Sequence, residues 1–107
     1  MKDLNKLLND MLNASIAIES YAVSSYEAFV DDEKTQDAIM YKLIVLGEAA
    51  NIIPSEFQDK HPEIPWSSII GTRNVIVHGY DQVKIQIVWD IIKNNIPQLR
   101  KSLKKLV

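Results

Sequence analysis

An arginine and a histidine lie five positions apart in residues 73–80, Arg-Asn-Val-Ile-Val-His-Gly-Tyr, which we call the motif segment. The planar guanidinium of Arg73 is a permanent cation that matches the oxygens of a phosphate. His78 can take up and return a proton near neutral pH. The pair would suffice for RNA cleavage: His78 would activate a 2′-hydroxyl or protonate the leaving oxygen, and Arg73 would stabilise the charge that develops on the phosphate. No carboxylate cluster accompanies them, so the sequence predicts neither a metal site nor a cofactor.

If the motif segment is helical, its side chains divide between two neighbouring stripes. One stripe is apolar apart from its arginine and contains Trp66, Ile70, Arg73, Val77 and Tyr80. The other is small or polar and contains Ser67, Gly71, Asn74 and His78. Because Asn74 and His78 are four positions apart, the amide is expected to reach and orient the imidazole. Gly71 is expected to let another backbone come close.

Arg73 and His78 lie about 140° apart around an ideal helix, so they cannot both point straight at one phosphate. Three solutions stay open: the arginine stem swings round, the helix loosens at Gly79, or a two-fold partner presents a second copy of the segment. The third also explains an arginine in an apolar stripe, since that stripe would line a cleft between two chains. We therefore favour a homodimer.

The residue types alone also fit a simpler interpretation, in which Arg73 is solvated and His78 is a partly buried structural residue. Glu48, an acid in the mostly apolar segment Leu-Gly-Glu-Ala-Ala, has two interpretations as well. It either pairs with an arginine or lysine across the bundle, or it positions Arg73. Spacing does not choose between these alternatives.

The apolar periodicity and the helix-breaking residues predict four helices in an antiparallel bundle of the all-α class. The first covers residues 3–29. The second is capped by Asp31 or Asp32 and stops at Pro54. Residues 54–65 form a connector with one helical turn at 55–59. The third helix starts near Pro65 and Trp66 and ends at about His78, with Gly79 as its C′ residue. The fourth covers 82–106, is capped by Asp81 and is kinked or broken by Pro97.

Composition narrows the class of protein. The 107 residues are expected to form a single domain (1–107), and 12 Lys/Arg against 14 Asp/Glu give a net charge of −2, which indicates no overall footprint for nucleic acid. The absence of cysteine excludes a disulfide framework and thiolate metal sites, and it is typical of a reducing cytoplasm. No apolar run reaches the length of a membrane span, so a cytoplasmic protein without membrane contact is expected.

The motif segment and several stretches around it resemble the HepT-like toxins of the HEPN superfamily. They are Thr35-Gln-Asp-Ala-Ile, Ile44-Val-Leu-Gly-Glu-Ala-Ala-Asn, His61-Pro-Glu-Ile-Pro-Trp, Gly71 through Tyr80, and Ile87-Val-Trp-Asp-Ile-Ile followed by Ile96-Pro-Gln-Leu. They occur in the family's order. The family motif is an arginine, a polar residue, three further residues and histidine, then any residue and tyrosine, and this chain satisfies it in full.

The resemblance implies a compact helical homodimer whose two motif copies face each other across a cleft. It implies a metal-independent endoribonuclease that is the toxin of a toxin–antitoxin pair, with Arg73 and His78 as its catalytic pair and Asn74 as the motif's polar residue. The motif tyrosine falls on Tyr80, to which a minimal nucleotidyltransferase antitoxin would transfer AMP from ATP and so silence the toxin. Two alternatives remain. The chain could be a catalytically silent module that binds and regulates a nucleotidyltransferase, or a purely structural helical dimer.

Overall fold

The computed structural model describes residues 3–107, and all its regular elements there are helical. The expected all-α class is therefore confirmed. In chain order the elements are α1 (Leu4–Tyr21), α2 (Tyr26–Val30), α3 (Glu33–Ile52), α4 (Ser55–Lys60), α5 (Trp66–Gly79), the short 3-10 helix η1 (Tyr80–Gln82), α6 (Ile85–Asn94) and α7 (Ile96–Lys104).

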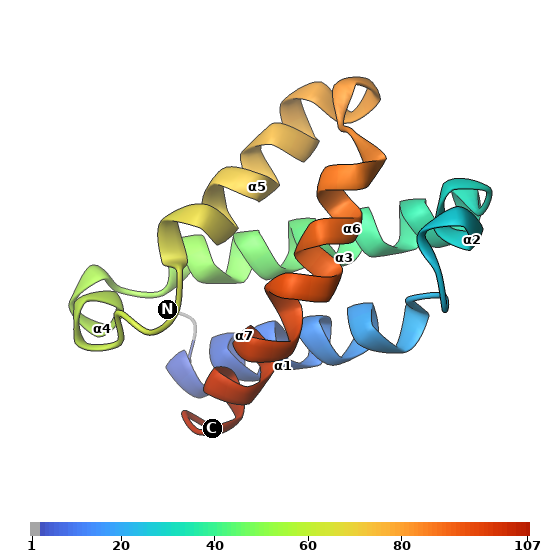
Figure 1. Ribbon diagram of the computed structural model, residues 1–107. Helices are drawn as coiled ribbons and strands as arrows, with labels where there is room; N and C mark the ends of the chain where they lie inside the picture. The colour runs from blue at the N-terminus through green and yellow to red at the C-terminus, as the bar shows by residue number, and fades with distance from the viewer. Residues whose placement is uncertain (1–2) are drawn as a thin grey trace.

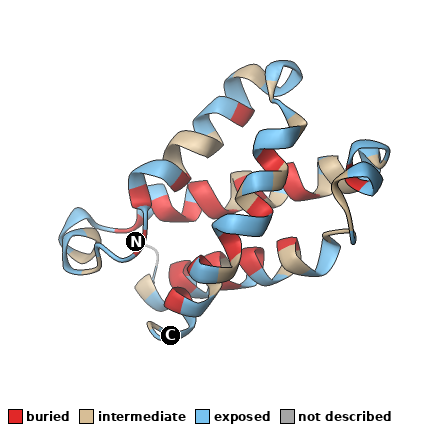
Figure 2. Ribbon diagram, viewed as in Figure 1, coloured by how far each residue is buried: buried red, intermediate tan, exposed pale blue. Residues whose placement is uncertain are grey.

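Helix α3 is the centre of the fold, because α1 packs along one side of it and α5 along another (Figure 1). Helix α6 runs down from the upper end of α5 in Figure 1, and α7 follows it and packs on α1. The buried residues, red in Figure 2, gather where these helices face one another. The fully enclosed members of this core include Leu7, Met11, Ile18, Phe29, Ile39, Ile76, Val88, Ile96 and Leu103. This packing presents α5, with the motif segment, at the outside of α3.

The prediction of one helix over 3–29 is wrong, since α1 ends at Tyr21 and α2 is a separate helix. Ser25 explains why a new helix begins at Tyr26. Its hydroxyl accepts a hydrogen bond from the N–H of Ala28 at 3.2 Å and so caps the N-terminus of α2. The apolar periodicity continues across the break, because Phe29 of α2 is fully buried and packs on Trp89. Periodicity therefore located the buried faces but could not reveal the turn between them.

The second and third predicted helices are largely confirmed. Asp32 caps α3, α4 extends the expected turn by one residue, and α5 begins at Trp66 directly after Pro65. Gly79 is not a left-handed C′ residue, however, because it has φ −144° and belongs to the last turn of α5. The chain instead keeps turning the same way into η1, so no left-handed residue is needed to end the helix.

The predicted fourth helix is shorter and is divided. Asp81 does not cap it, because Asp81 lies in η1 and α6 begins only at Ile85. The expected break is confirmed, but it lies at Asn95, two residues before Pro97. Pro97 has no N–H, and its ring would collide with the carbonyl four residues earlier, so the regular hydrogen-bond ladder stops ahead of it.

Replacement of Asp32 by alanine is expected to lower the thermal unfolding midpoint at neutral pH. The Asp32 carboxylate accepts hydrogen bonds from the Thr35 hydroxyl at 2.7 Å and the Thr35 N–H at 3.0 Å, and these hold its pKa below the ordinary 3.8. A lowered pKa gives stability that is present above pH 3.8 and is lost as the pH falls through the folded-state value. The difference between parent and variant should therefore shrink in acid; a constant difference in thermal melts across that range would contradict the assignment.

Candidate active site

Helix α5 contacts α3 through a stripe that differs in part from the one expected. Trp66, Ile69 and Ile76 are the buried residues of α5, whereas Val77, expected on the apolar stripe, is 44% exposed. Arg73 lies between Ile69 and Ile76 in this 3-4-3 series. The motif arginine therefore does lie on the contact stripe, with Ile69 and Ile76 as its buried neighbours rather than Ile70 and Val77.

Gly47 of α3 permits the close approach of the two helices at Arg73. A Cβ placed on Gly47 would lie 2.2 Å from the Cβ of Arg73 and 3.1 Å from the carbonyl oxygen of Ile69. Gly71 was expected to allow such an approach, but a Cβ placed there would meet no atom of the described residues within 4 Å, so that expectation is wrong within this chain. A glycine inside a helix costs about 1 kcal/mol relative to alanine, so both Gly47 and Gly71 were candidates for a close contact between helices.

The Arg73 guanidinium is held from two sides. Its Nη1 donates to Oδ1 of Asn74 at 2.9 Å, and its Nη2 lies 3.5 Å from Oε1 of Glu48. Its Nε is buried and has no hydrogen-bond partner among residues 3–107. The Arg73 side chain is 28% exposed and that of Glu48 is 55% exposed, so this long ion pair is in contact with water and contributes little to stability. A phosphate could therefore replace Glu48 at small cost.

Asn74 and His78 both lie on the exposed side of α5. The expected contact of the Asn74 amide with the imidazole is replaced by the hydrogen bond from Arg73 to Asn74. The hydrogen bond therefore links the stripe that contains Arg73 to the neighbouring stripe that contains Asn74 and His78. His78, in the last turn of α5, presents an accessible imidazole.

Tyr80 is the first residue of η1 and returns to α3. Its hydroxyl donates a hydrogen bond to Oδ1 of Asp37, and the residue is 46% exposed. That hydrogen bond, with partial burial and the negative charges of Asp37 and Glu33, raises the pKa of Tyr80 to about 12. Asp37 and Glu48 are eleven positions apart on α3, which is about three helical turns. Because Tyr80 contacts Asp37 and Arg73 contacts Glu48, the Tyr80 hydroxyl is held well apart from the Arg73 guanidinium.

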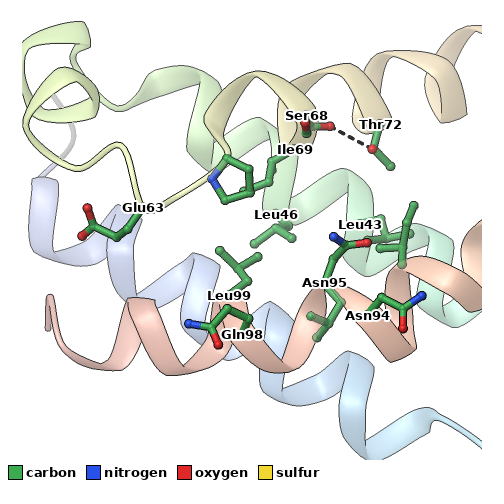
Figure 3. Close-up of a pocket in the computed structure, with 13 residues that line it drawn as sticks. Leu43, Leu46, Glu63, Ser68, Ile69, Thr72, Asn94, Asn95, Gln98 and Leu99 are labelled. Atoms are coloured by element: carbon green, nitrogen blue, oxygen red, sulfur yellow. Dashed lines mark hydrogen bonds between the residues drawn. The ribbon is translucent and has the colours of Figure 1, made fainter.

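A cavity of about 400 Å³ lies between α5 and the α6–α7 pair, with α3 at its floor (Figure 3). Leu43, Leu46, Ile69 and Leu99 supply apolar walls, and the hydrogen bond from the Thr72 hydroxyl to the Ser68 carbonyl runs along one rim. Within the described part of the chain, Glu63 is the one charged residue that lines the cavity, and its negative charge repels phosphate. The lining contains no residue of the motif segment, so this cavity is separate from the candidate site around Arg73.

The described residues also bear on metals and membranes. Residues 3–107 contain no group of three or more histidine, cysteine or acidic side chains arranged to hold a metal ion. Over the same stretch, none of the helices combines the length and the apolar character that crossing a membrane requires.

Comparison with known proteins gives one consistent family. The model of the ribonuclease HepT-like family matches residues 11–106. A protein of Thermococcus cleftensis named "Probable ribonuclease HepT" is 36% identical over 92% of this chain and 91% of its own length. Proteins of Methanocaldococcus jannaschii (32% identical, 99% of this chain and 88% of the relative) and Caldanaerobacter subterraneus (37%, 84% and 80%) are each named a "Putative RNase". No solved structure matches. This chain belongs to the HepT-like ribonuclease family.

Proposed function

We propose that this protein is a single-domain, metal-independent endoribonuclease and the toxin of a toxin–antitoxin pair. The observation that supports the proposal is that the Arg73 side chain is both held in place and partly exposed. Its guanidinium is fixed by Asn74 and by the contact with α3, yet it remains partly exposed and has only a weak, water-exposed ion pair with Glu48. A fixed, accessible cation with an exposed histidine five residues further on is suited to bind and cleave a phosphodiester.

In the proposed reaction Arg73 exchanges Glu48 for the scissile phosphate, and the developing negative charge strengthens that contact. His78 transfers the proton at the 2′-hydroxyl or at the leaving oxygen. Asn74 orients the guanidinium through its hydrogen bond. Glu48 keeps Arg73 in place until RNA binds, which combines the two interpretations of this residue.

The proposed active form is a homodimer. Exposed apolar side chains flank the Arg73–Glu48 pair on both helices: Tyr41 (61% exposed) and Ile52 (49%) share the stripe of Glu48 on α3, and Val77 lies one turn after Arg73 on α5. Apolar groups that surround a functional pair are typical of a surface that another chain covers. A two-fold contact there would place two copies of Arg73 and His78 around one cleft and so resolve their angular separation on a single helix.

Purified protein is expected to cleave RNA in the presence of excess EDTA, at the rate it shows with added Mg²⁺. The reason is that Arg73 and His78 supply the charge stabilisation and the proton transfer that a metal would otherwise provide. The measurement is the length distribution of mixed cellular RNAs with time. A rate that collapses in EDTA and returns with a divalent cation would refute metal independence, and no cleavage of any RNA class would refute the nuclease.

The proposed antitoxin is a minimal nucleotidyltransferase that transfers AMP from ATP to Tyr80. Tyr80 is accessible to a second protein, because it directly follows the last turn of α5 and is about half exposed. An added AMP would bring bulk and a negative phosphate to this end of α5, two residues after the exposed His78, where it would obstruct the approach of RNA.

A further inference from the structure

The stretch Thr35-Gln-Asp lies near the start of α3, and all three of its side chains form hydrogen bonds. Thr35 binds the capping Asp32. The Gln36 amide donates to the carbonyl oxygens of Phe29 at 2.7 Å and Val30 at 3.0 Å, which fixes the end of α2 against α3. Asp37 accepts the hydrogen bond of Tyr80. The carboxylate of Asp37 therefore stands on a fixed turn, and its partner is the motif tyrosine.

Among residues 3–107 the Asp37 carboxylate forms no ion pair, and Tyr80 is its one hydrogen-bond donor. The second negative charge that acts on the Tyr80 phenol is Glu33, one turn earlier on α3. Both Asp37 and Tyr80 lie at the surface, so a second protein can reach the hydroxyl where it meets the carboxylate.

This environment makes an unassisted reaction of the phenol slow. With a pKa of about 12, Tyr80 is ionised in on the order of one molecule in 10⁵ at neutral pH. A neutral phenol is a poor nucleophile, so group transfer to its oxygen requires a base that removes the proton as the new bond forms. A carboxylate that already accepts this hydrogen bond satisfies the geometric requirement for that base.

We propose that Asp37 is the general base for nucleotidyl transfer onto Tyr80. The inference rests on the proposed off-switch and adds its acceptor chemistry. The Tyr80 oxygen attacks the α-phosphorus of a nucleoside triphosphate, so an O–P bond forms and the bond from that phosphorus to its bridging oxygen breaks. Pyrophosphate leaves, the phenolic proton passes to Asp37, and Asp37 then releases it to water. The toxin thus supplies the base for its own modification.

The test measures AMP transfer to the intact protein by a minimal nucleotidyltransferase with ATP and Mg²⁺, with the site mapped by mass spectrometry. Asp37→Asn keeps an oxygen acceptor but loses the basicity, and it is expected to slow transfer to Tyr80 by about 10²- to 10⁴-fold. Its rate should rise about tenfold per pH unit, because only ionised phenol then reacts, while the parent rate changes far less. Glu33→Gln removes the neighbouring charge without touching the hydrogen bond and should stay near the parent rate. Tyr80→Phe marks the modified position.

RNA cleavage by unmodified Asp37→Asn provides the control for folding and should match the parent, since Asp37 lies about three turns of α3 from Glu48. If the parent accepts AMP on Tyr80 and Asp37→Asn accepts it at the same rate and with the same pH profile, the role of Asp37 is refuted and the off-switch stands. If the parent accepts no AMP on Tyr80, the off-switch is refuted, and the inference about Asp37 falls with it.

Discussion

RNA cleavage by the His78→Ala variant is expected to fall by about 10²- to 10⁴-fold, the usual contribution of a positioned proton-transfer group. The fold should not change, because His78 is exposed in the last turn of α5 and supports none of the packing against α3. The measurement is the initial rate of cleavage, together with thermal melts and sedimentation to show an unchanged fold and assembly. An unchanged rate would remove the histidine from the mechanism.

The chain offers a matched control in its other histidine, His61. This residue contacts Glu63 through its Nδ1 at 3.1 Å and stacks near the ring of Phe57, in the loop that follows α4. His61→Ala therefore removes the same side chain from a structural environment, and it should leave cleavage near the parent level. Equal losses in the two variants would indicate that either change merely damages the protein.

A mixing experiment separates a shared cleft from two independent sites. Arg73→Ala and His78→Ala are each expected to cleave RNA far more slowly than the parent when tested alone. If a two-fold contact brings both motif copies into one cleft, a dimer of one chain of each kind still contains one Arg73 and one His78. Partial recovery of cleavage after subunit exchange would then follow, whereas no recovery despite proven exchange would contradict a site built from both chains.

Local signals in the sequence were sufficient for most of the helical framework, because caps and prolines act within a few residues. Asp32 and Pro65 are such signals, and the helices that they introduce begin where expected. The break between α1 and α2 was missed because apolar spacing continues across it, and spacing reports burial rather than backbone continuity. The spacing within the motif segment identified the candidate site residues but not the contact of Tyr80 with Asp37, and it left the partner of Glu48 open. These contacts join positions far apart in the chain, where local spacing carries no information.

The two glycines of the site show this limit most directly. Both Gly47 and Gly71 lie inside helices, and nothing local to either tells which one faces another backbone. The sequence favoured Gly71, because it shares a stripe with Asn74 and His78. The structure gives that role to Gly47, whose neighbours come from α5.

Gly47→Ala is expected to destabilise the protein by about 1–3 kcal/mol and to reduce RNA cleavage, while Gly71→Ala should stabilise it by up to about 1 kcal/mol. Both variants gain the same helix propensity. At Gly47 the new methyl would overlap the Cβ of Arg73 at 2.2 Å and press on the Ile69 carbonyl, and neither of these atoms can rotate away, so α3 and α5 must separate. At Gly71 the methyl enters open space. Denaturant unfolding measures both differences.

The cleavage measurement on Gly47→Ala must be made well below its unfolding temperature, so that every chain is folded. A shift of α5 away from α3 would move Arg73 from Glu48 and displace the guanidinium relative to His78, and small displacements of a reacting group cost large factors in rate. A stable Gly47→Ala protein that cleaves RNA at the parent rate would show that the tight contact is not what positions Arg73. If cleavage falls by more than the fraction of folded protein, the close contact at Gly47 helps to position Arg73, the proposed catalytic cation.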